Sequence, residues 1–430
     1  MKILHTADWH LGASLDSVSL LEDQRRFLDW LLEVIREEGV DALLVSGDVF
    51  DLRNPSAEAQ ALYYRFLARL ATLDPAPAAV ITAGNHDSPS RLAAPSELLD
   101  ALRIRVVGGV GPKEAWSDHL LVPLPDAEAP EVVVAAVPYV HEYTLGVSPV
   151  GLAPGELGRA MHDAFAELYG TLAREAAERW PGARRIALGH LTVGGGPVSR
   201  DDFPNEIHQV GTIDALPPSL FSEGWDYVAL GHIHRPMPVG RGTYRYSGTP
   251  VAISFGEAAP ERQLRLLEIG EEGLTHRALP VPRHRTLVKL AGSEEAVMKR
   301  LGSTTFPGPL EGLLRVEIAV ERWDPGLEER IRQAVRALGD EAPRLVSVVQ
   351  RAVDSWEGGG DEGASLPPLE EMPPDEVFRR LVRVRRGGAA PQDDDALMVA
   401  FREILSAPEE ADDVATAGGV DASAGEGRDP

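Results

Sequence analysis

Cysteine is absent from all 430 residues of the chain. The protein therefore forms no disulfide bond and offers no thiolate to a metal ion, which fits a reducing compartment. The chain also lacks any run of about 20 apolar residues, the length that a membrane-spanning helix needs. The apolar stretch near Met1 is interrupted too soon for a secretory signal. We therefore expect a cytoplasmic protein with no membrane association.

Basic residues are also scarce, because 42 lysines and arginines face 67 aspartates and glutamates and give a net charge of −25. Nucleic-acid-binding proteins contact phosphate through lysine and arginine, so composition alone does not suggest one. Two segments, Glu357–Glu376 at −7 and Pro408–Pro430 at −6, hold half of this charge and leave −12 on the rest of the chain. Bound divalent cations would offset part of the remainder. Any affinity for nucleic acid would therefore depend on bound cations and not on an excess of basic residues.

Five apolar runs along the chain are each followed by a polar motif. The runs predict buried strands at Ile3–Ala7, Ala42–Ser46, Ala79–Ala83, Ile186–Leu188 and Tyr227–Leu230. The motifs that follow them are Asp8-Trp9-His10, Gly47-Asp48-Val49-Phe50-Asp51, Gly84-Asn85-His86-Asp87, Gly189-His190 and Gly231-His232-Ile233-His234. A polar residue at the carboxyl end of a strand lies in the crevice where open α/β sheets bind ligands. The five motifs are therefore expected to share one site.

The residue types in these motifs suit a centre of two metal ions. Imidazole, carboxylate and amide oxygen bind Mn, Fe, Zn or Mg, and no thiolate is present. Asp48 is the expected bridge between two cations, and the other ligands fall into two sets, Asp8, His10 and His234 for one cation and Asn85, His190 and His232 for the other. Two cations about 3.5–4 Å apart activate water and neutralise charge on a phosphoryl group during in-line displacement. The motifs therefore predict phosphoester hydrolysis.

His86 lies beside the predicted ligand Asn85 and need not bind metal itself. Imidazole titrates near neutral pH, so His86 is a candidate general acid for the leaving oxygen. Asp51, three residues after the expected bridge, could accept a hydrogen bond from His86 and fix its tautomer. Taken singly, each motif is commonly a turn residue or a helix cap. Their joint occurrence at the ends of five strands favours a metal site instead.

Longer similarities surround these motifs. Three lie near the N-terminus: His5-Thr6-Ala7-Asp8-Trp9-His10-Leu11-Gly12, Gly47-Asp48-Val49-Phe50-Asp51 and Gly84-Asn85-His86-Asp87-Ser88. Others extend past the metal motifs: Ala229-Leu230-Gly231-His232-Ile233-His234-Arg235, Tyr246-Ser247-Gly248-Thr249-Pro250 and Ser254-Phe255. The chain resembles the calcineurin-like metallophosphoesterases and, more closely, the SbcD family of bacterial nuclease subunits. The resemblance is strong over residues 1–285 and weak over residues 286–405.

The resemblance implies a manganese-dependent exonuclease and endonuclease that acts on double-stranded DNA ends and hairpins in DNA repair, recombination and replication. It also implies an ATPase partner of the SbcC type and a homodimer within a heterotetramer. It assigns His86 as a catalytic residue that binds no metal, and as metal ligands Asp8, His10, Asp48, Asn85, His190, His232 and His234. Some relatives carry histidine where this chain has Asp51, which leaves the catalytic role of Asp51 open.

Helical and extended patterns alternate over the first half of the chain. The segments Leu20–Glu38, Ala57–Thr72 and Gly158–Arg179 predict helices with one apolar face. After Tyr227 the pattern is mainly extended, and it predicts strands at Thr243–Ser247, Val251–Phe255, Gln263–Ile269 and Leu274–Leu279. Two facing sheets with helices outside would bury both halves. We therefore expect an α/β fold, a four-layer sandwich of two mixed β-sheets flanked by helices.

The chain is long enough for two or three domains. We expect a metallophosphoesterase nuclease domain at residues 1–282 and a small α/β capping domain at residues 286–353. In the capping domain, strands Thr286–Leu290, Leu313–Val320 and Arg344–Gln350 alternate with helices Ser293–Leu301 and Gly326–Leu338. The composition of residues 357–373 predicts a flexible acidic linker, and that of residues 408–430 a disordered acidic tail.

Two amphipathic helices are expected between the linker and the tail, at Pro374–Arg386 and Asp393–Leu405. Short helices beyond a flexible linker have no core of their own, so residues 374–405 predict a helical partner-binding segment. The alternative is that both helices pack on the nuclease domain.

Two other functions share parts of this pattern. A stand-alone metallophosphoesterase acting on small phosphodiesters or phosphoproteins would use the same metal chemistry, but it would not need residues 286–405. A non-catalytic scaffold would have lost ligands, and every expected ligand is present in the sequence. The nuclease subunit is therefore the favoured interpretation.

Overall fold

The computed structural model describes residues 1–148, 154–194, 215–221, 224–240, 242–258, 261–339 and 342–352, together with Phe378, Met398 and Phe401. These residues fall into two compact units. The first comprises Met1–Ile318 and Glu328–Val349, and the second contains Ala319–Leu327 and the described residues from position 350 onward. The candidate site lies wholly in the first unit.

The first large sheet has the strand order β14-β13-β1-β4-β5-β6. Strands β1, β4, β5 and β6 are parallel, whereas β13 pairs antiparallel with β1 and β14 antiparallel with β13. The sheet is therefore mixed, and its antiparallel edge comes from a distant part of the chain. The strands are β1 (Lys2–Thr6), β4 (Ala42–Ser46), β5 (Ala78–Thr82), β6 (Ile104–Val107), β13 (Gln263–Gly270) and β14 (Gly273–Pro280).

The second large sheet has the order β11-β12-β10-β9-β8-β7 and is also mixed. Strands β8, β9, β10 and β12 are parallel, and the edge strands β7 and β11 are antiparallel to their neighbours. The strands are β7 (Leu121–Leu124), β8 (Val132–Ala136), β9 (Arg184–His190), β10 (Tyr227–Gly231), β11 (Met237–Pro238) and β12 (Tyr244–Tyr246).

The parallel strands are buried on both faces, and alternate residues serve different cores. Ile3 and Leu44 pack in the core that contains the second sheet. Their neighbours Leu4 and Val45 pack in the core shared with helices α1 (Leu21–Glu38) and α2 (Ala57–Ala71). This alternation follows from the two-residue period of a strand, and it requires near-continuous apolar sequence.

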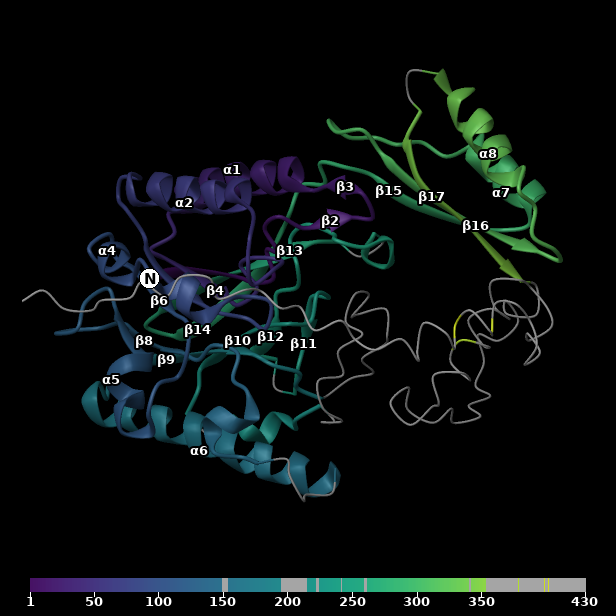
Figure 1. Ribbon diagram of the computed structural model, residues 1–430. Helices are drawn as coiled ribbons and strands as arrows, with labels where there is room; N and C mark the ends of the chain where they lie inside the picture. The colour runs from purple at the N-terminus through teal and green to yellow at the C-terminus, as the bar shows by residue number, and fades with distance from the viewer. Residues whose placement is uncertain are drawn as a thin grey trace, which may run out of the picture. The chain divides into compact units, whose positions relative to one another are not determined.

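Helices cover the outer faces of both sheets (Figure 1). Helices α1 and α2 lie over the first sheet, while α5 (Trp116–Leu120) and α6 (Pro154–Arg179) lie over the second. The order helix, sheet, sheet, helix confirms the expected four-layer sandwich. Shorter elements in the same unit are β2 (Ser14–Leu15), β3 (Val18–Ser19), α3 (Pro89–Ala93) and α4 (Ser96–Asp100).

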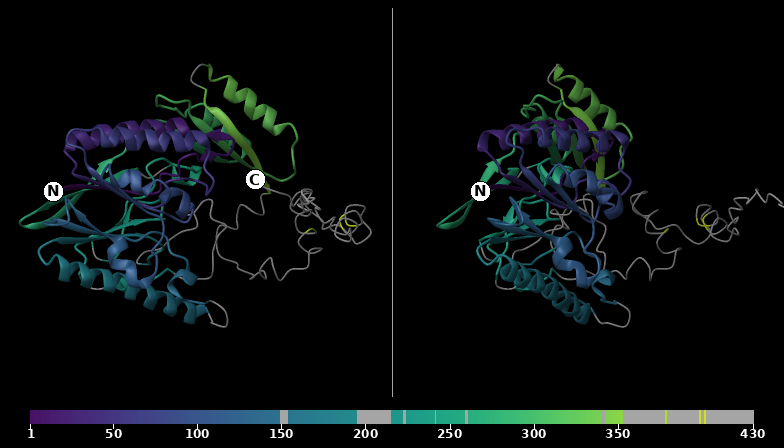
Figure 2. Two further views of the ribbon diagram at one scale, coloured as in Figure 1. Left: turned by 60° about the vertical axis from the view of Figure 1, so that its left-hand side comes forward. Right: turned by 90° about the vertical axis from the view of Figure 1, so that its left-hand side faces the viewer.

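A third sheet of three strands has the order β15-β16-β17, namely Leu287–Gly292, Leu313–Val320 and Arg344–Ala352. Helices α7 (Glu294–Leu301) and α8 (Leu327–Arg336) run along one face of it (Figure 2). Val297 of α7 and Ile331 of α8 are fully buried there. The alternation of strands and helices expected for this region is confirmed.

The segment Val251–Phe255 is not a strand, contrary to the sequence prediction. The chain is irregular up to a short 3₁₀ turn at Phe255–Glu257. The backbone N–H of Ile253 donates to Glu257 Oε2 at 3.0 Å, so a side chain takes the donor that a sheet ladder would use. The alternating apolar pattern is real, but a local acceptor outcompetes strand pairing.

The acidic linker, the two expected C-terminal helices and the tail lie outside the described residues, apart from three positions. Phe378 and Phe401 stack with their ring centroids 4.0 Å apart, and Met398 is fully buried. Among the described residues, no helix is both long and apolar enough to cross a membrane.

Candidate metal centre

The carboxyl ends of five parallel strands, three from one sheet and two from the other, meet at the candidate centre. Three groups of side chains there hold potential ligand atoms within 4.8 Å of one another. The groups are Asp8, His10 and His234; His10, Asp48 and His86; and Asp48, His190 and His232. Every carboxylate and imidazole predicted as a ligand from the sequence therefore lies in one cluster.

Asn85, the remaining predicted ligand, joins the cluster through its amide oxygen. Asn85 Oδ1 lies 3.0 Å from His190 Nε2 and 3.1 Å from His232 Nδ1. One oxygen atom thus faces two imidazoles from neighbouring strands of the second sheet, while Asn85 itself follows a strand of the first. The same oxygen is available to a cation between them.

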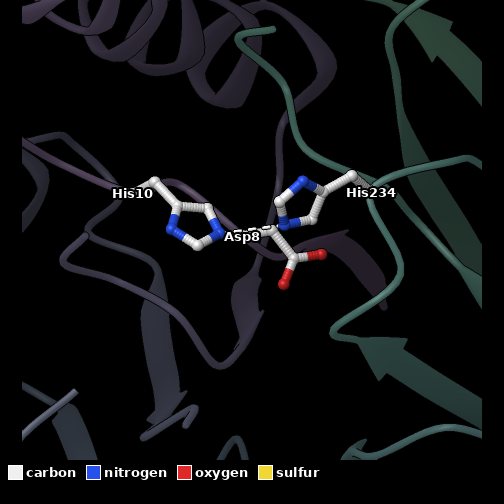
Figure 3. A group of neighbouring side chains, drawn as sticks. All are labelled: Asp8, His10 and His234. Carbon is white, nitrogen blue, oxygen red and sulfur yellow. Dashed lines mark hydrogen bonds between the residues drawn. The ribbon is translucent and has the colours of Figure 1, made fainter. Parts of the chain in front are cut away.

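His10 and His234 face each other across the two sheets, with Asp8 beside them (Figure 3). Their Nε2 atoms are 3.0 Å apart. His234 Nδ1 lies 3.0 Å from the Glu257 carboxylate, and His10 Nδ1 lies 3.3 Å from that of Asp51. A carboxylate at Nδ1 favours the N–H there and leaves a lone pair at Nε2. The lone pairs on His10 Nε2 and His234 Nε2 then point into the same space, as they do when two histidines bind one metal ion.

His190 is oriented in the same way. Its Nδ1 donates to the main-chain carbonyl of Ser46 at 2.8 Å. Its Nε2 therefore turns toward the Asp48 carboxylate, whose Oδ2 lies 3.2 Å away. The acceptor at Nδ1 again fixes the tautomer that leaves Nε2 free to coordinate.

Buried carboxylate oxygens give an independent test of whether cations fit this centre. Asp8 and Asp48 are at most 1% exposed. Among the described residues, Asp8 Oδ2 has no hydrogen-bond donor, and Asp48 Oδ2 has none when His190 Nε2, 3.2 Å away, carries no proton. Leaving an ionised acceptor buried and unsatisfied is costly, whereas a coordinated cation removes that cost. The donor set of carboxylate, imidazole and amide oxygen therefore fits divalent metal ions.

The backbone at the strand ends adopts a conformation that the sequence did not reveal. Four of the predicted ligands have positive φ: Asp8 at 54°, His10 at 45°, Asp48 at 49° and His232 at 93°. Non-glycine residues rarely occupy this region, and such strain is retained mainly at functional sites. Hydrogen bonds between loops hold it, since the N–H of Asp8 donates to Gly47 O and that of His10 to Asp48 O, both at 3.0 Å.

Glycines precede four of the ligands, and at two of these glycines a side chain would overlap another ligand. A Cβ atom on Gly47 would overlap the imidazole of His190, and one on Gly84 would overlap the carboxylate of Asp48. Gly47 also has φ of 84°. The glycine in each motif therefore permits the close approach of loops from different strands.

The buried carboxylates and imidazoles change one another's pKa values. Burial favours neutral His190, but the carboxylates of Asp48 and Asp8 outweigh it and raise the pKa of His190 to about 9. Burial raises the pKa of Asp8. Burial also opposes ionisation of Asp48, yet His190, His10 and His86 hold the Asp48 pKa well below its ordinary value. The negative charge is thus strong enough to retain a proton on a buried imidazole, and a bound cation competes with that proton.

His86 lies at the edge of the cluster and contacts both Asp48 and Asp51. Its main-chain N–H donates to Asp48 Oδ1 at 2.9 Å. Its Nδ1 donates to the main-chain carbonyl of Asp51 at 2.8 Å. The Asp51 side chain instead faces His10, so the hydrogen bond considered from the sequence exists but uses the backbone of Asp51 rather than its carboxylate.

Glu257 is a residue of this centre that sequence reasoning missed. Its carboxylate is 4% exposed and lies against His234 Nδ1. Arg262 supports the pair, because it contacts Glu257 and donates to the main-chain oxygen of His234 at 3.0 Å. No motif marks Glu257, which follows His234 by 23 residues and belongs to no strand.

Asp87 is the second supporting residue. Its buried carboxylate accepts the backbone N–H groups of Val49, Phe50 and Gly84 at 2.8–3.1 Å. It therefore ties the loop after β4 to the loop after β5, which carry Asp48 and Asn85. The sequence showed Asp87 within a motif but gave no indication of this bracing role.

Comparison with known proteins adds family information to this geometry. Residues 1–236, which include all five motifs, match the family model of calcineurin-like phosphoesterases. The chain is 38% identical over 304 residues to SbcD of the nuclease SbcCD from Rhodobacter capsulatus, covering 70% of this chain and 74% of that protein. It is 31% identical over 391 residues to SbcD of Escherichia coli K12, covering 88% of this chain and 92% of that protein. SbcD of Bacillus subtilis is 34% identical over 295 residues, covering 65% of this chain and 69% of that protein.

Proposed function

Since the chain belongs to the calcineurin-like phosphoesterases and, within them, to the SbcD subunits of SbcCD nucleases, we propose that it hydrolyses phosphodiester bonds of double-stranded DNA at ends and hairpins. Membership makes the protein a metal-dependent hydrolase and a nuclease subunit. The observation that carries the proposal is the meeting of strand ends from two sheets, which brings imidazoles, carboxylates and one amide oxygen around Asp48.

We assign the centre two divalent cations, with manganese as the metal that the family resemblance favours. Asp48 lies between two sets of proposed ligands, Asp8, His10 and His234 on one side and Asn85, His190 and His232 on the other. When bound, the two cations activate water and offset charge on the phosphoryl group.

His86 is proposed as the general acid for the leaving oxygen. Its Nδ1 is occupied by the Asp51 carbonyl, so Nε2 is the nitrogen that exchanges a proton with substrate. The hydrogen bond from its backbone to Asp48 holds the imidazole beside the centre. Asp51 then has two positioning roles, on His86 through its carbonyl and on His10 through its carboxylate.

Glu257 and Asp87 are proposed to keep the ligands in place. Glu257 fixes the tautomer and ring orientation of His234, as carboxylates commonly do for metal-bound histidines. Asp87 holds two ligand-bearing loops at a constant separation. Neither residue needs to touch the substrate.

We propose a partner subunit as well, an ATPase of the SbcC type, because the relatives are described as one subunit of a complex. Residues 374–405 would bind it, and a homodimer of this chain would form part of a heterotetramer. The proposed organisation is a nuclease domain at residues 1–282, a capping domain at 286–353, a linker at 357–373 and a tail at 408–430. The proposed location is the cytoplasm.

Substrate class is the first thing to test. We expect manganese-dependent digestion of end-labelled linear duplex DNA, with slower hydrolysis of bis(p-nitrophenyl) phosphate and least of p-nitrophenyl phosphate. His86→Ala should lower manganese-dependent digestion of DNA by about 100-fold or more, which excludes a contaminating nuclease. Hydrolysis of the small diester without digestion of DNA would instead support a stand-alone phosphodiesterase.

The number of metal ions per chain is the second property to test. Elemental analysis of manganese-saturated protein should give two ions per chain. Asp48→Ala should lower this number more than Asn85→Ala or His234→Ala, since only Asp48 faces both sets of ligands. One ion in the unsubstituted protein under saturating manganese would rule out the two-metal assignment.

A further inference from the structure

The loop after β8 approaches the metal centre from the side of the second sheet. The N–H of Tyr139 donates to Ala83 O at 2.8 Å, directly before the Gly84-Asn85 motif. The Tyr139 ring stands edge-on to the imidazole of His190, with centroids 6.2 Å apart and an interplanar angle of 78°. Tyr139 therefore touches the centre through both its backbone and its side chain.

Two further aromatic rings continue from Tyr139 toward the surface. Tyr139 meets His141 edge to face, with centroids 4.9 Å apart. His141 stacks on Tyr143 with centroids 5.2 Å apart and only 13° between the planes. Tyr143 is 70% exposed. Each step between ring centroids is shorter than 6.5 Å, so the three rings lead from His190 to the surface in short steps.

A hydrogen-bonded turn fixes the outer pair of rings. Within the 3₁₀ turn Glu142–Leu145, the N–H of Thr144 donates to His141 O at 3.0 Å and that of Gly146 to Tyr143 O at 3.1 Å. Val147, which follows, is buried in the core around the second sheet. The backbone that carries the two rings is therefore fixed by the turn and by buried Val147, while the rings themselves lie outside the core.

A flat pair of rings, with Tyr143 exposed and His141 half-buried, lies near a phosphoesterase centre and matches one kind of ligand surface. Nucleobases are planar and stack on aromatic side chains without base-specific hydrogen bonds. Phosphate is the poorer match, because Glu142, the residue between the two aromatic residues in the sequence, adds a negative charge. An unpaired base has an open face, whereas a base inside a duplex is already stacked on both sides.

We propose that His141 and Tyr143 form a stacking platform for an unpaired nucleobase of the strand whose phosphodiester lies at the metal centre. This inference rests on the proposed nuclease function. The platform adds binding energy for single-stranded ends and for opened terminal base pairs, and it takes no part in bond cleavage. Tyr139 links the platform to His190 and so fixes its distance from the reacting phosphate.

Cleavage kinetics with matched substrates test the platform. The full-length protein with manganese is given single-stranded oligonucleotides that are intact or carry one abasic site, which is moved along the strand. Tyr143→Ala should raise KM for the intact strand about 5- to 150-fold, the range for loss of one base stack. Tyr143→Phe should restore it, because the ring face is kept. When the abasic site lies at the stacking position, the unsubstituted protein and Tyr143→Ala should cleave the strand with equal KM.

The controls separate this inference from the nuclease proposal. Tyr143→Ala should leave kcat/KM for bis(p-nitrophenyl) phosphate unchanged, since that diester does not reach the platform. Two results would overturn the platform and leave the nuclease proposal standing. One is an unchanged KM for the intact strand in Tyr143→Ala. The other is a rise in KM in Tyr143→Ala that is the same wherever the abasic site lies. Failure of the unsubstituted protein to cleave any DNA while it hydrolyses the small diester overturns the nuclease proposal, and the platform with it. Loss of partner binding in Tyr143→Ala with unchanged DNA kinetics would assign these rings to a protein interface instead.

Discussion

At the residue scale, the acceptor that faces Nδ1 of each ligand histidine sets the orientation of its ring. Glu257 faces Nδ1 of His234, Asp51 faces that of His10, and the Ser46 carbonyl accepts from His190. Each partner directs the Nε2 atom of its histidine into the cluster. The ligand geometry is therefore set by the neighbours of the ligands as much as by the ligands themselves.

The role of His86 is open to a direct test. His86→Ala should retain both metal ions and lose nuclease activity by about 100-fold or more, in the range of proton-transfer catalysis. Asp51→Asn should be milder, because it keeps the carbonyl that accepts from His86. Metal content by elemental analysis accompanies each rate. Loss of metal together with activity in His86→Ala would make His86 a ligand, which its position beside His10 and Asp48 also permits.

His5 gives the stability of the protein a dependence on pH. The side chain is fully buried with Nδ1 3.2 Å from the Tyr227 hydroxyl, and burial lowers the pKa of His5 to about 3. In the unfolded chain His5 has an ordinary histidine pKa of about 6.5. Between pH 6.5 and pH 3 it is therefore protonated in the unfolded chain but neutral in the folded protein. Stability contributed by neutral His5 is therefore complete above pH 6.5 and is lost as pH falls toward 3.

The expected loss from His5 is about 2 kcal/mol between pH 7.5 and pH 5, as an order of magnitude. Urea unfolding at both values measures it, and His5→Gln should reduce the difference by that amount. The partly exposed His162 provides the control substitution, His162→Gln, which should leave the difference unchanged. An equal pH dependence in His5→Gln and the unsubstituted protein would contradict the assignment.

At the scale of elements, irregular segments support the ligands that the strands deliver. The segment from Val251 to Glu257 forms no strand, since the Glu257 carboxylate takes the Ile253 N–H and also faces His234. One side chain thus shapes its own loop and orients a ligand from another. A strand in this place could not have done both.

Glu257→Ala should therefore weaken metal binding or activity by about 10- to 100-fold, the range for loss of a carboxylate behind a metal-bound histidine. Calorimetric titration of manganese and the nuclease rate report the two effects. Glu261→Ala, four residues away and exposed, is the matched control and should bind metal normally. Equal metal affinity and activity in the two variants would remove Glu257 from the centre.

At the scale of the whole molecule, metal chemistry and partner binding are expected to be separable. All proposed ligands lie between positions 8 and 234, whereas the amphipathic segments Pro374–Arg386 and Asp393–Leu405 follow an acidic stretch with little apolar content. Truncation after Trp356 should leave a folded, metal-loaded protein that no longer binds its ATPase partner, because helix-in-groove contacts would be lost without opening the core.

Pull-down of the truncated chain with the ATPase subunit, beside a thermal melt and a metal measurement, tests this separation. Undiminished binding would place the partner site elsewhere. A large drop in melting temperature would show that the removed segments stabilise the remaining protein. The full-length chain is the reference in both measurements.

The sequence by itself determined the helices and strands whose signals lie within a short stretch of the chain. Apolar runs with two-residue or helical periods are local signals, and they located β4 and β16 at their observed limits and α1 and α2 within one residue. A polar motif after each run, beginning with glycine in four of the five, also identified the potential ligands. These patterns are visible because a strand and the turn that follows it are specified within about ten residues.

Only the tertiary structure decided which side chains meet and how they are oriented. The hydrogen bond from Asp8 to Gly47 that holds a positive φ, the pairing of Glu257 with His234 and the contact of Tyr139 with His190 all join segments far apart in the chain. No local pattern encodes them, because each arises from packing two sheets so that their strand ends coincide. The sequence therefore names the donors of the centre, and the close packing of the sheets determines their geometry.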